Sequence, residues 1–420
     1  MRPAEMQQLG RLAGRATGAT ALIAKDVHRS IASRTFDALG VLGAPVRVLH
    51  DGISSAAYKG VHAALAAPAA AAAGLAARTS LATPVPLADS PRGGIALGVL
   101  NAAVGDALTR DYRELALELT VRRRGRPVDV DPAGVAEAFP RASSKLAVFI
   151  HGLAETEHAW ELRPFAQARA ERRSYGSRLR EDLGYTPVYV RYNTGLHVSD
   201  NGRRLAEALE ELVRAWPGAV DELALVGHSM GGLVARSASH YGAASGHAWI
   251  EPLRHVFCLG TPHLGAPLEK AANVAGWALG RTAMTRPFAD LVNGRSAGIK
   301  DLRYGNCVEK DWCDCDPDEF IRDRCTEVPF VAHAAYYFIG ATLSRDPGDP
   351  LATLAGDLLV RFPSASGRGA KRRIPFEIDN GAHVGGLHHF QLLNHPAVYE
   401  QVRKWLTRRH AAKTRLAAAS

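Results

Sequence analysis

The sequence predicts an α/β protein with a mostly parallel sheet flanked by helices, and three observations support this fold class. Short, continuously apolar runs typical of buried strands occur at residues 145–150, 188–190, 223–226, 256–259 and 335–342. Stretches of helical character lie between them, such as Ser199–Trp216. A glycine-rich turn follows the third run. With 420 residues, 47% of them hydrophobic, the chain can bury a full core around such a sheet.

Residues 1–140 are expected to form an Ala-rich, mainly helical extension. Alanine favours helices but anchors poorly in a bilayer, and Pro68 and Gly74 interrupt the Ala-rich stretch, so no transmembrane span is expected. Polar residues such as Gln7 and Arg11 break the apolar core that a signal peptide needs. The expected location is therefore cytoplasmic, with membrane association left open.

The extension is expected to end near residue 140, because turn-forming glycine and proline residues cluster between 125 and 144. Just before this boundary, Leu115–Val121 is a candidate for the strand that starts the sheet. The sequence leaves open whether the extension wraps the second domain, binds lipid or mediates assembly.

The strongest chemical signal is the sequence Gly-His-Ser-Met-Gly-Gly at residues 227–232, between a buried strand and a helical stretch. In a sharp strand-to-helix turn of the G-x-S-x-G type, the central residue is held in a strained conformation with its hydroxyl exposed at the sheet edge. The helix behind it begins with positive potential, which favours an oxyanion. Ser229 is therefore the candidate nucleophile.

A second signal follows the first buried strand of the domain, where His151, Gly152 and Leu153 form a loop. In this type of site, one oxyanion-hole amide comes from such a loop and the other from the residue after the nucleophile. The candidate donors are the backbone N–H groups of Leu153 and Met230.

These two motifs, together with Gly-Thr-Pro-His-Leu-Gly-Ala-Pro at residues 260–267, resemble the α/β-hydrolase lipases and esterases. The nearest branch is that of the bacterial triacylglycerol lipases and GPI-inositol-deacylase-like proteins. The resemblance covers roughly residues 145–407. It implies an α/β-hydrolase catalytic domain, which we place at residues 141–410, and triad partners that follow Ser229 in the order acid, histidine.

The resemblance places the base in the loop before the last helix, where His389 is the candidate and His388, one residue away, remains an alternative. Asp357 is the candidate acid. Similar lipases carry Gly-Asp-Gly-x-Val there, and Leu358 replaces the second glycine in this chain. Asp346 and Asp349 are alternatives in a turn-forming stretch, where aspartate commonly caps the backbone.

Residues 268–330 are expected to form a lid or cap insertion. Its first half carries apolar residues at helical spacing, which suits helices that cover an acyl-binding pocket or belong to the core. Its second half holds Cys307, Cys313, Cys315 and Cys325 in an acidic loop. Two disulfides, free thiols and a metal site are all open, although the spacing matches no familiar zinc pattern, so no metal is expected.

The net charge of +9 includes basic clusters at Arg122–Arg126, Lys371–Arg373 and Arg403–Arg415. Such clusters would attract an anionic membrane surface, or they belong to an ordinary solvated surface. No nucleic-acid-binding motif accompanies them, so no nucleic-acid partner is expected. Residues 411–420 are expected to be a basic, disordered tail, and the sequence does not indicate an oligomeric state.

The sequence therefore predicts a serine carboxylic-ester hydrolase of the lipase or esterase type, acting on acyl-ester or lipid substrates without a cofactor. The alternatives are an acyltransferase or thioesterase with the same triad, an amide or peptide hydrolase, and a non-catalytic lipid-binding protein that retains the fold.

Overall fold

The computed structural model describes residues 1–16, 85–161, 173–279, 281, 286–320, 322–346, 356–370 and 372–417, with isolated positions between 25 and 74. Most of the Ala-rich stretch lies outside the described residues, as do Asp349, Met284 and Lys371. Within the described part, no helix combines the length and apolarity needed to cross a bilayer.

The described residues form an eight-stranded sheet in the order β2-β1-β4-β3-β5-β6-β7-β8. Strands β3 to β8 pair in parallel, whereas β1 and β2 run antiparallel at one edge. The strands are β1 Thr120–Arg123, β2 Arg126–Pro127, β3 Lys145–Ile150, β4 Thr186–Arg191, β5 Glu222–His228, β6 Leu253–Leu259, β7 Ala335–Thr342 and β8 Gly381–Gly385. This mostly parallel sheet confirms the predicted α/β-hydrolase fold.

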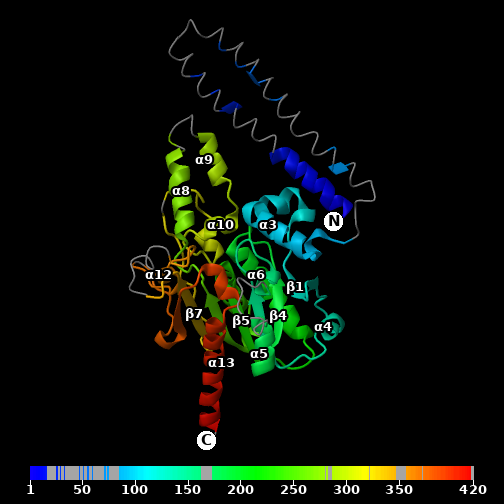
Figure 1. Ribbon diagram of the computed structural model, residues 1–420, viewed down its shortest axis with the longest axis vertical. Coiled ribbons are helices and arrows are strands. Elements are labelled where there is room, and N and C mark those ends of the chain that lie inside the picture. Colours follow the sequence, from blue (N-terminus) through cyan, green and yellow to red (C-terminus); the bar gives the residue numbers. More distant parts are fainter. Residues whose placement is uncertain are drawn as a thin grey trace.

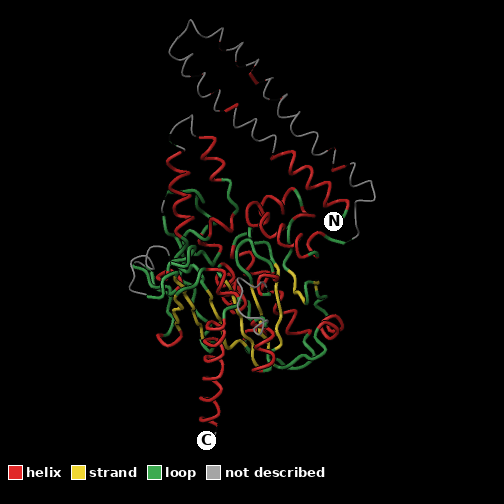
Figure 2. The backbone as a smooth tube through the Cα atoms, viewed as in Figure 1, coloured by secondary structure: helices red, strands yellow, loops and turns green. Residues whose placement is uncertain are grey.

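Helices cover both faces of the sheet (Figures 1 and 2). Besides the helix at residues 3–16, the described α-helices are α3 Pro91–Asp111, α4 Pro132–Ala138, α5 Tyr175–Leu183, α6 Val198–Ala215, α7 Met230–Ala244, α8 Pro267–Leu279, α9 Arg286–Asn293, α10 Ala297–Asp301, α12 Phe362–Ala365 and α13 Pro396–Ala417. Short 3₁₀ helices include η2 Leu87–Asp89, η3 Arg113–Leu115, η4 Glu157–Trp160, η5 Ala248–Ile250, η6 Glu309–Asp311, η7 Ile378–Asn380 and η8 His389–Leu393.

Alternate residues of each strand face opposite layers, so every central strand must be apolar on both sides. On β3, Leu146 and Val148 pack with α6 and α7 in one buried cluster. Ala147 and Phe149 of the same strand pack with α5 and α13 in the other. This two-sided burial explains why the strands are continuously apolar in the sequence.

The N-terminal segment packs beside the sheet. Residues 3–16 are helical, and the buried carboxylate of Glu5 accepts the backbone N–H of Leu87 at 2.8 and 3.0 Å. Helix α3 buries Leu97 and Leu108 in a small apolar cluster with Leu115. Figure 1 shows the N-terminal helix in blue beside α3.

Two boundaries differ from expectation. Of the candidate strand Leu115–Val121, only the last two residues join β1, because Leu115 ends η3 and packs against α3 instead. Because β1 pairs with β4, this shorter strand still joins the sheet ahead of residue 140, as expected for the candidate strand. At the other end of the chain, α13 continues to Ala417, into the segment expected to be a disordered tail.

A buried ion network joins the N-terminal segment to the sheet. Glu157 accepts hydrogen bonds from Arg191 Nε at 2.6 Å and Arg122 Nε at 3.2 Å, and all three side chains are almost fully buried. Arg122 also contacts Asp89, and Arg191 donates to the carbonyl of Ala88. Burial raises the pKa of Glu157, but the hydrogen bond and charge of Arg191 and the charge of Arg122 outweigh burial and lower it.

We expect Glu157→Gln to lower the free energy of unfolding by about 3–5 kcal/mol, because it leaves buried arginines without their countercharge. A group with a lowered pKa contributes stability above its unfolded pKa of about 4.3 and loses it as the pH falls through the folded value. The difference between the wild type and the variant should therefore shrink below pH 4 or so. Chemical denaturation at pH 7 and at acid pH measures both effects.

The matched control is Glu181→Gln, which removes a carboxylate from an exposed ion pair with Arg173. Solvent screens such a pair, so the denaturation midpoint should not move. Equal effects of the two substitutions would show that the Glu157 network does not secure the N-terminal segment.

Candidate active site

The candidate residues converge at the carboxyl edge of the sheet. Strand β3 lies between β4 and β5, so the chain leaves β3 toward one neighbour and later returns to the other side. In open α/β sheets, ligands bind at such a switch point, outside the carboxyl ends of the strands. The loops after β3 and β5 carry Leu153 and Ser229, and the segments after β7 and β8 carry Asp357 and His389.

Ser229 occupies a strained turn between β5 and α7, with φ 51° and ψ −122°. A non-glycine residue at positive φ costs free energy, of order 1–3 kcal/mol, and persists only where its surroundings enforce it. The surroundings here are tightly packed. A Cβ on Gly231 would lie 2.2 Å from the carbonyl oxygen of Ile150, and one on Gly227 would lie 2.5 Å from the backbone of Gly231. Both glycines of the motif are thus required by backbone contact.

The two candidate oxyanion donors flank this turn. Met230 is the first residue of α7, where a helix presents N–H groups without intrahelical partners. Leu153 follows Gly152, whose Cβ would lie 3.0 Å from the Cβ of Ser229. Neither N–H donates a hydrogen bond to another group among the described residues. Both are therefore available to a substrate oxygen.

Asp357 and His389 form a buried pair. His389 Nδ1 lies 2.7 Å from Asp357 Oδ2, and the backbone N–H of His389 donates to the carbonyl of Asp357 at 3.0 Å. The other carboxylate oxygen, Oδ1, accepts the N–H groups of Leu359 and Val360. His389 Nε2 is buried and has no hydrogen-bond partner within the described residues. The ring is thus fixed through Nδ1, with Nε2 left for another proton partner.

The alternative acid and base residues lie differently. Asp346 is exposed, and its backbone N–H donates to Ser344 Oγ. Asp349 lies outside the described residues. His388 precedes the 3₁₀ helix η8 as its N-cap residue, half-buried, whereas His389 is buried.

Leu358 stands where the lipase pattern has its second glycine, and its backbone shows how the turn accommodates the change. Its φ is 84°, in the left-handed region that glycine adopts readily, and its side chain is 65% exposed. The turn therefore keeps the backbone that Gly-Asp-Gly would give, with a leucine in a strained position. Asp357 depends on this turn, because Oδ1 binds the two N–H groups that follow it.

Ser229 and His389 line one pocket of about 310 Å³. Its walls are mainly apolar and come from the loops after β3 and β6, from α8 and α10, and from the segments beside Asp357 and His389. The apolar lining residues are Leu153, Pro262, Ala266, Leu268, Ala272, Ile299, Leu302, Leu359, Val360 and Phe390. A volume and lining of this kind suit a small organic group of low polarity.

The pocket also has charged lining residues that sequence analysis did not single out. Glu269 of α8 is buried and binds Arg295 through two hydrogen bonds of 2.9 Å and Arg303 through one of 3.0 Å. Glu155 lines the pocket as well. None of these residues belongs to a short motif, so their position depends on the tertiary fold.

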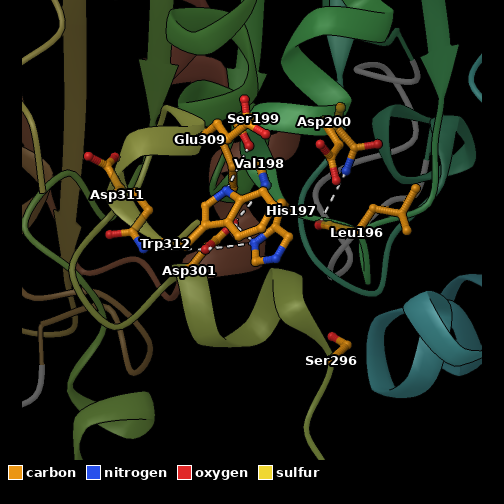
Figure 3. A network of polar contacts seen from close by, with 12 residues as sticks. Leu196, His197, Val198, Ser199, Asp200, Ser296, Asp301, Glu309, Asp311 and Trp312 are labelled. Atoms are coloured by element: carbon orange, nitrogen blue, oxygen red, sulfur yellow. Dashed lines mark hydrogen bonds and ion pairs between the residues drawn. The ribbon is translucent and has the colours of Figure 1, made fainter. Parts of the chain in front are cut away.

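Polar contacts fix helix α10, which supplies Ile299 to the pocket and is followed by the lining residue Leu302 (Figure 3). Asp301 accepts the N–H of Val198 at 2.8 Å and lies 3.1 Å from His197 Nδ1. The His197 ring stacks on Trp312 with centroids 3.6 Å apart. Burial lowers the pKa of His197, but the hydrogen bond and charge of Asp301 raise it above the ordinary value. This cluster joins α10 to α6 and to the cysteine-containing loop.

All five cysteines are free thiols in this structure, and Cys307 is buried. Burial raises the pKa of the Cys307 thiol to about 11. In the described part of the chain, no group of three or more His, Cys, Asp or Glu side chains is arranged to hold a metal ion.

The fold and the site define the class of protein, an α/β-hydrolase with a serine in the strained turn between β5 and α7. Residues 140–306 match the sequence model of a family described as "Putative serine esterase (DUF676)". The match supports a serine ester hydrolase, and it covers the segment that holds Leu153 and Ser229 but not Asp357 or His389. A search of curated proteins finds no match.

Solved structures of bacterial lipases are similar in outline. The mature Bacillus licheniformis lipase BlEst2 is 20% identical, with 69% of this chain and 97% of that chain covered and a TM-score of 0.42. The Staphylococcus hyicus lipase is 13% identical, with 65% and 97% covered and a TM-score of 0.34. The Legionella pneumophila phospholipase PlaB is 15% identical, with 59% and 53% covered and a TM-score of 0.34.

We expect Leu358→Gly to keep the esterase activity and to unfold at an equal or higher temperature, because glycine accepts the positive φ without strain. Leu358→Val should be destabilised by about 1–3 kcal/mol, since a β-branched residue is least suited to this conformation. Thermal unfolding of both variants measures the effect. Greater loss of stability in the glycine variant would contradict the strain at this turn.

Proposed function

We propose that the chain hydrolyses carboxylic esters through a Ser229–His389–Asp357 triad and an acyl-enzyme. The observation that carries the proposal is the buried contact of 2.7 Å between His389 and Asp357 beside the pocket that Ser229 also lines. In unliganded enzymes the contact between nucleophile and base is often loose and tightens with substrate.

In the proposed mechanism, Ser229 Oγ attacks the ester carbonyl carbon while His389 Nε2 takes the hydroxyl proton. Asp357 holds the Nδ1–H tautomer and stabilises the imidazolium. The N–H groups of Leu153 and Met230 bind the oxyanion, each worth about 3–4 kcal/mol in comparable sites. The tetrahedral intermediate expels the alkoxide, which takes the proton from His389. Water then attacks the acyl-enzyme by the same steps and releases the acid.

The substrate follows from the pocket. Its walls are mainly apolar, which favours an acyl chain over a sugar or a charged peptide. The acyltransferase and thioesterase alternatives use the same chemistry with another acceptor or leaving group. They would appear as ester synthesis in the presence of alcohols, or as a preference for thioesters over oxygen esters of the same acid.

We expect the wild type to hydrolyse p-nitrophenyl acetate, butyrate, octanoate or palmitate, and Ser229→Ala to lose about 10⁴-fold or more in kcat. Asp357→Asn should lose about 10⁴-fold, because the wrong histidine tautomer is then favoured. His388→Ala is the matched control and should retain activity. Full activity in Ser229→Ala would exclude the proposed nucleophile, and loss in His388→Ala but not in His389→Ala would reassign the base.

We also propose that α8 contacts a lipid surface during turnover. Its buried residues are Glu269, Asn273 and Gly276, whereas Leu268 and Trp277 are exposed, 68% and 42% respectively. A surface helix normally has the opposite arrangement, and exposed apolar residues beside a pocket are typical of an interaction site. Figure 1 shows α8 and α9 side by side, projecting from the sheet edge.

We expect Val274→Ser combined with Trp277→Ser, two exposed residues of α8 that do not line the pocket, to lower activity on esters presented in vesicles by roughly tenfold, because apolar contact with the lipid is lost. Activity on a monomeric short-chain ester should change little. Parallel assays above and below the critical micelle concentration separate the two effects. An equal loss on both substrates would indicate damage to the pocket and contradict the lipid-contact proposal.

A further inference from the structure

A second carboxylate–histidine pair lies beside the nucleophile. His228, the last residue of β5, is fully buried and immediately precedes Ser229. Its Nδ1 lies 3.0 and 3.1 Å from the two carboxylate oxygens of Glu155, which is itself 8% exposed. Its ring centroid lies 4.8 Å from that of His389. The mechanism above assigns no role to either residue of this pair.

Both ring nitrogens of His228 face hydrogen-bond acceptors. Nε2 lies 3.2 Å from the backbone carbonyl oxygen of His389, which can only accept. Nε2 must therefore carry a hydrogen. On the other side, a carboxylate also only accepts, so Nδ1 must carry a second hydrogen unless Glu155 is protonated.

The surroundings of Glu155 favour the ionised carboxylate. Its Oε2 accepts the backbone N–H of Gly152 at 2.7 Å, and a hydrogen bond of this kind stabilises the charged form. Burial raises the pKa of Glu155, but the charge and hydrogen bond of His228 outweigh burial and lower it. Burial lowers the pKa of His228, and the charge and hydrogen bond of Glu155 reverse this and raise it. The favoured state is an imidazolium paired with a carboxylate.

This pair connects the two loops that the proposed reaction needs. Glu155 holds Gly152, the residue before the candidate oxyanion donor Leu153. His228 holds the backbone of His389, the candidate base. Gly152 lies against Ser229, Glu155 and His228 at once, so a change in the pair would move the oxyanion loop and the base relative to Ser229.

We propose that Glu155 and His228 are positioning residues, and that the doubly protonated His228 sets the spacing of the oxyanion loop and His389 around Ser229. The inference rests on the proposed function. Within the described chain, the titratable groups that act on His228 are Glu155 after β3, Asp357 after β7 and His389 after β8.

The pH dependence has a defined sign. Because the pKa of His228 is raised above the ordinary value of about 6.5, the positioned state is complete below that value. It is lost as the pH rises through the higher pKa of the folded protein. We therefore expect kcat to fall on the alkaline side with the titration of His228. In Glu155→Gln this limb should move to lower pH, because the neutral amide no longer stabilises the imidazolium.

The kinetic test compares Glu155→Gln with a matched control on the same strand. Glu222, at the other end of β5, contacts His255 Nε2 at 3.0 Å in another buried pair, about 20 Å from His228 along the strand. We expect Glu155→Gln to lower kcat roughly 10- to 100-fold at pH 7, a loss typical of a displacement near 1 Å. Glu222→Gln should leave the pH profile unchanged. An unchanged alkaline limb in folded Glu155→Gln would overturn the proposal.

The second measurement needs no activity. Histidine ¹⁵N NMR of the unliganded wild type, with His228→Gln to assign the signal, reports whether both ring nitrogens carry hydrogens. Two protonated nitrogens at pH 7 that titrate above the ordinary range support the pair. A neutral His228 ring would overturn it even if Glu155→Gln does not fold. A wild type that shows the imidazolium but hydrolyses no ester would instead contradict the proposed function.

Discussion

The structure depends on one close backbone contact, between the start of α7 and the end of β3. Gly231 lies so near the carbonyl oxygens of Ile150 and His151 that no side chain fits there. This contact brings the N-terminus of α7 over the sheet edge and holds Ser229 at positive φ. It also places the amide of Met230 beside the loop after β3. The strain at one residue is thus maintained by packing over two central strands.

The sequence predicted those parts of the candidate site that depend only on residues close together in the chain. The turn at Ser229, the loop at Leu153 and the buried strands each follow from short patterns of glycine and apolar residues. His389 and Asp357 were predictable only through family resemblance, because they lie 32 residues apart and meet through the order of the strands. Leu358 replaces a glycine of the lipase pattern and still adopts the positive φ that glycine favours, which the sequence alone does not indicate.

Other features depend on contacts between distant segments and gave no sequence signal. Glu155 and His228 are 73 residues apart, and neither the loop after β3 nor the glycine-rich turn indicates that they pair. Helix α8 was expected to be amphipathic, but its pattern does not tell which face is inside. The structure buries Glu269 because Arg295 and Arg303 neutralise it, and this leaves apolar side chains outside. The buried ion pairs of Glu269 therefore determine which face of α8 points inward, whereas hydrophobicity alone would predict that the apolar face does.

Helix α10, which forms part of the pocket wall, is hydrogen-bonded to helix α3 near the N-terminus. Ser296, which caps α10, donates its N–H to the carbonyl of Ala103 and its hydroxyl to that of Ala102, both in α3. The segment that matches the esterase family begins at residue 140, after α3. The contacts that hold α10 therefore extend beyond the segment that matches the family model. Helix α3, which lies outside that segment, thus fixes the start of α10, whose Ile299 lines the pocket.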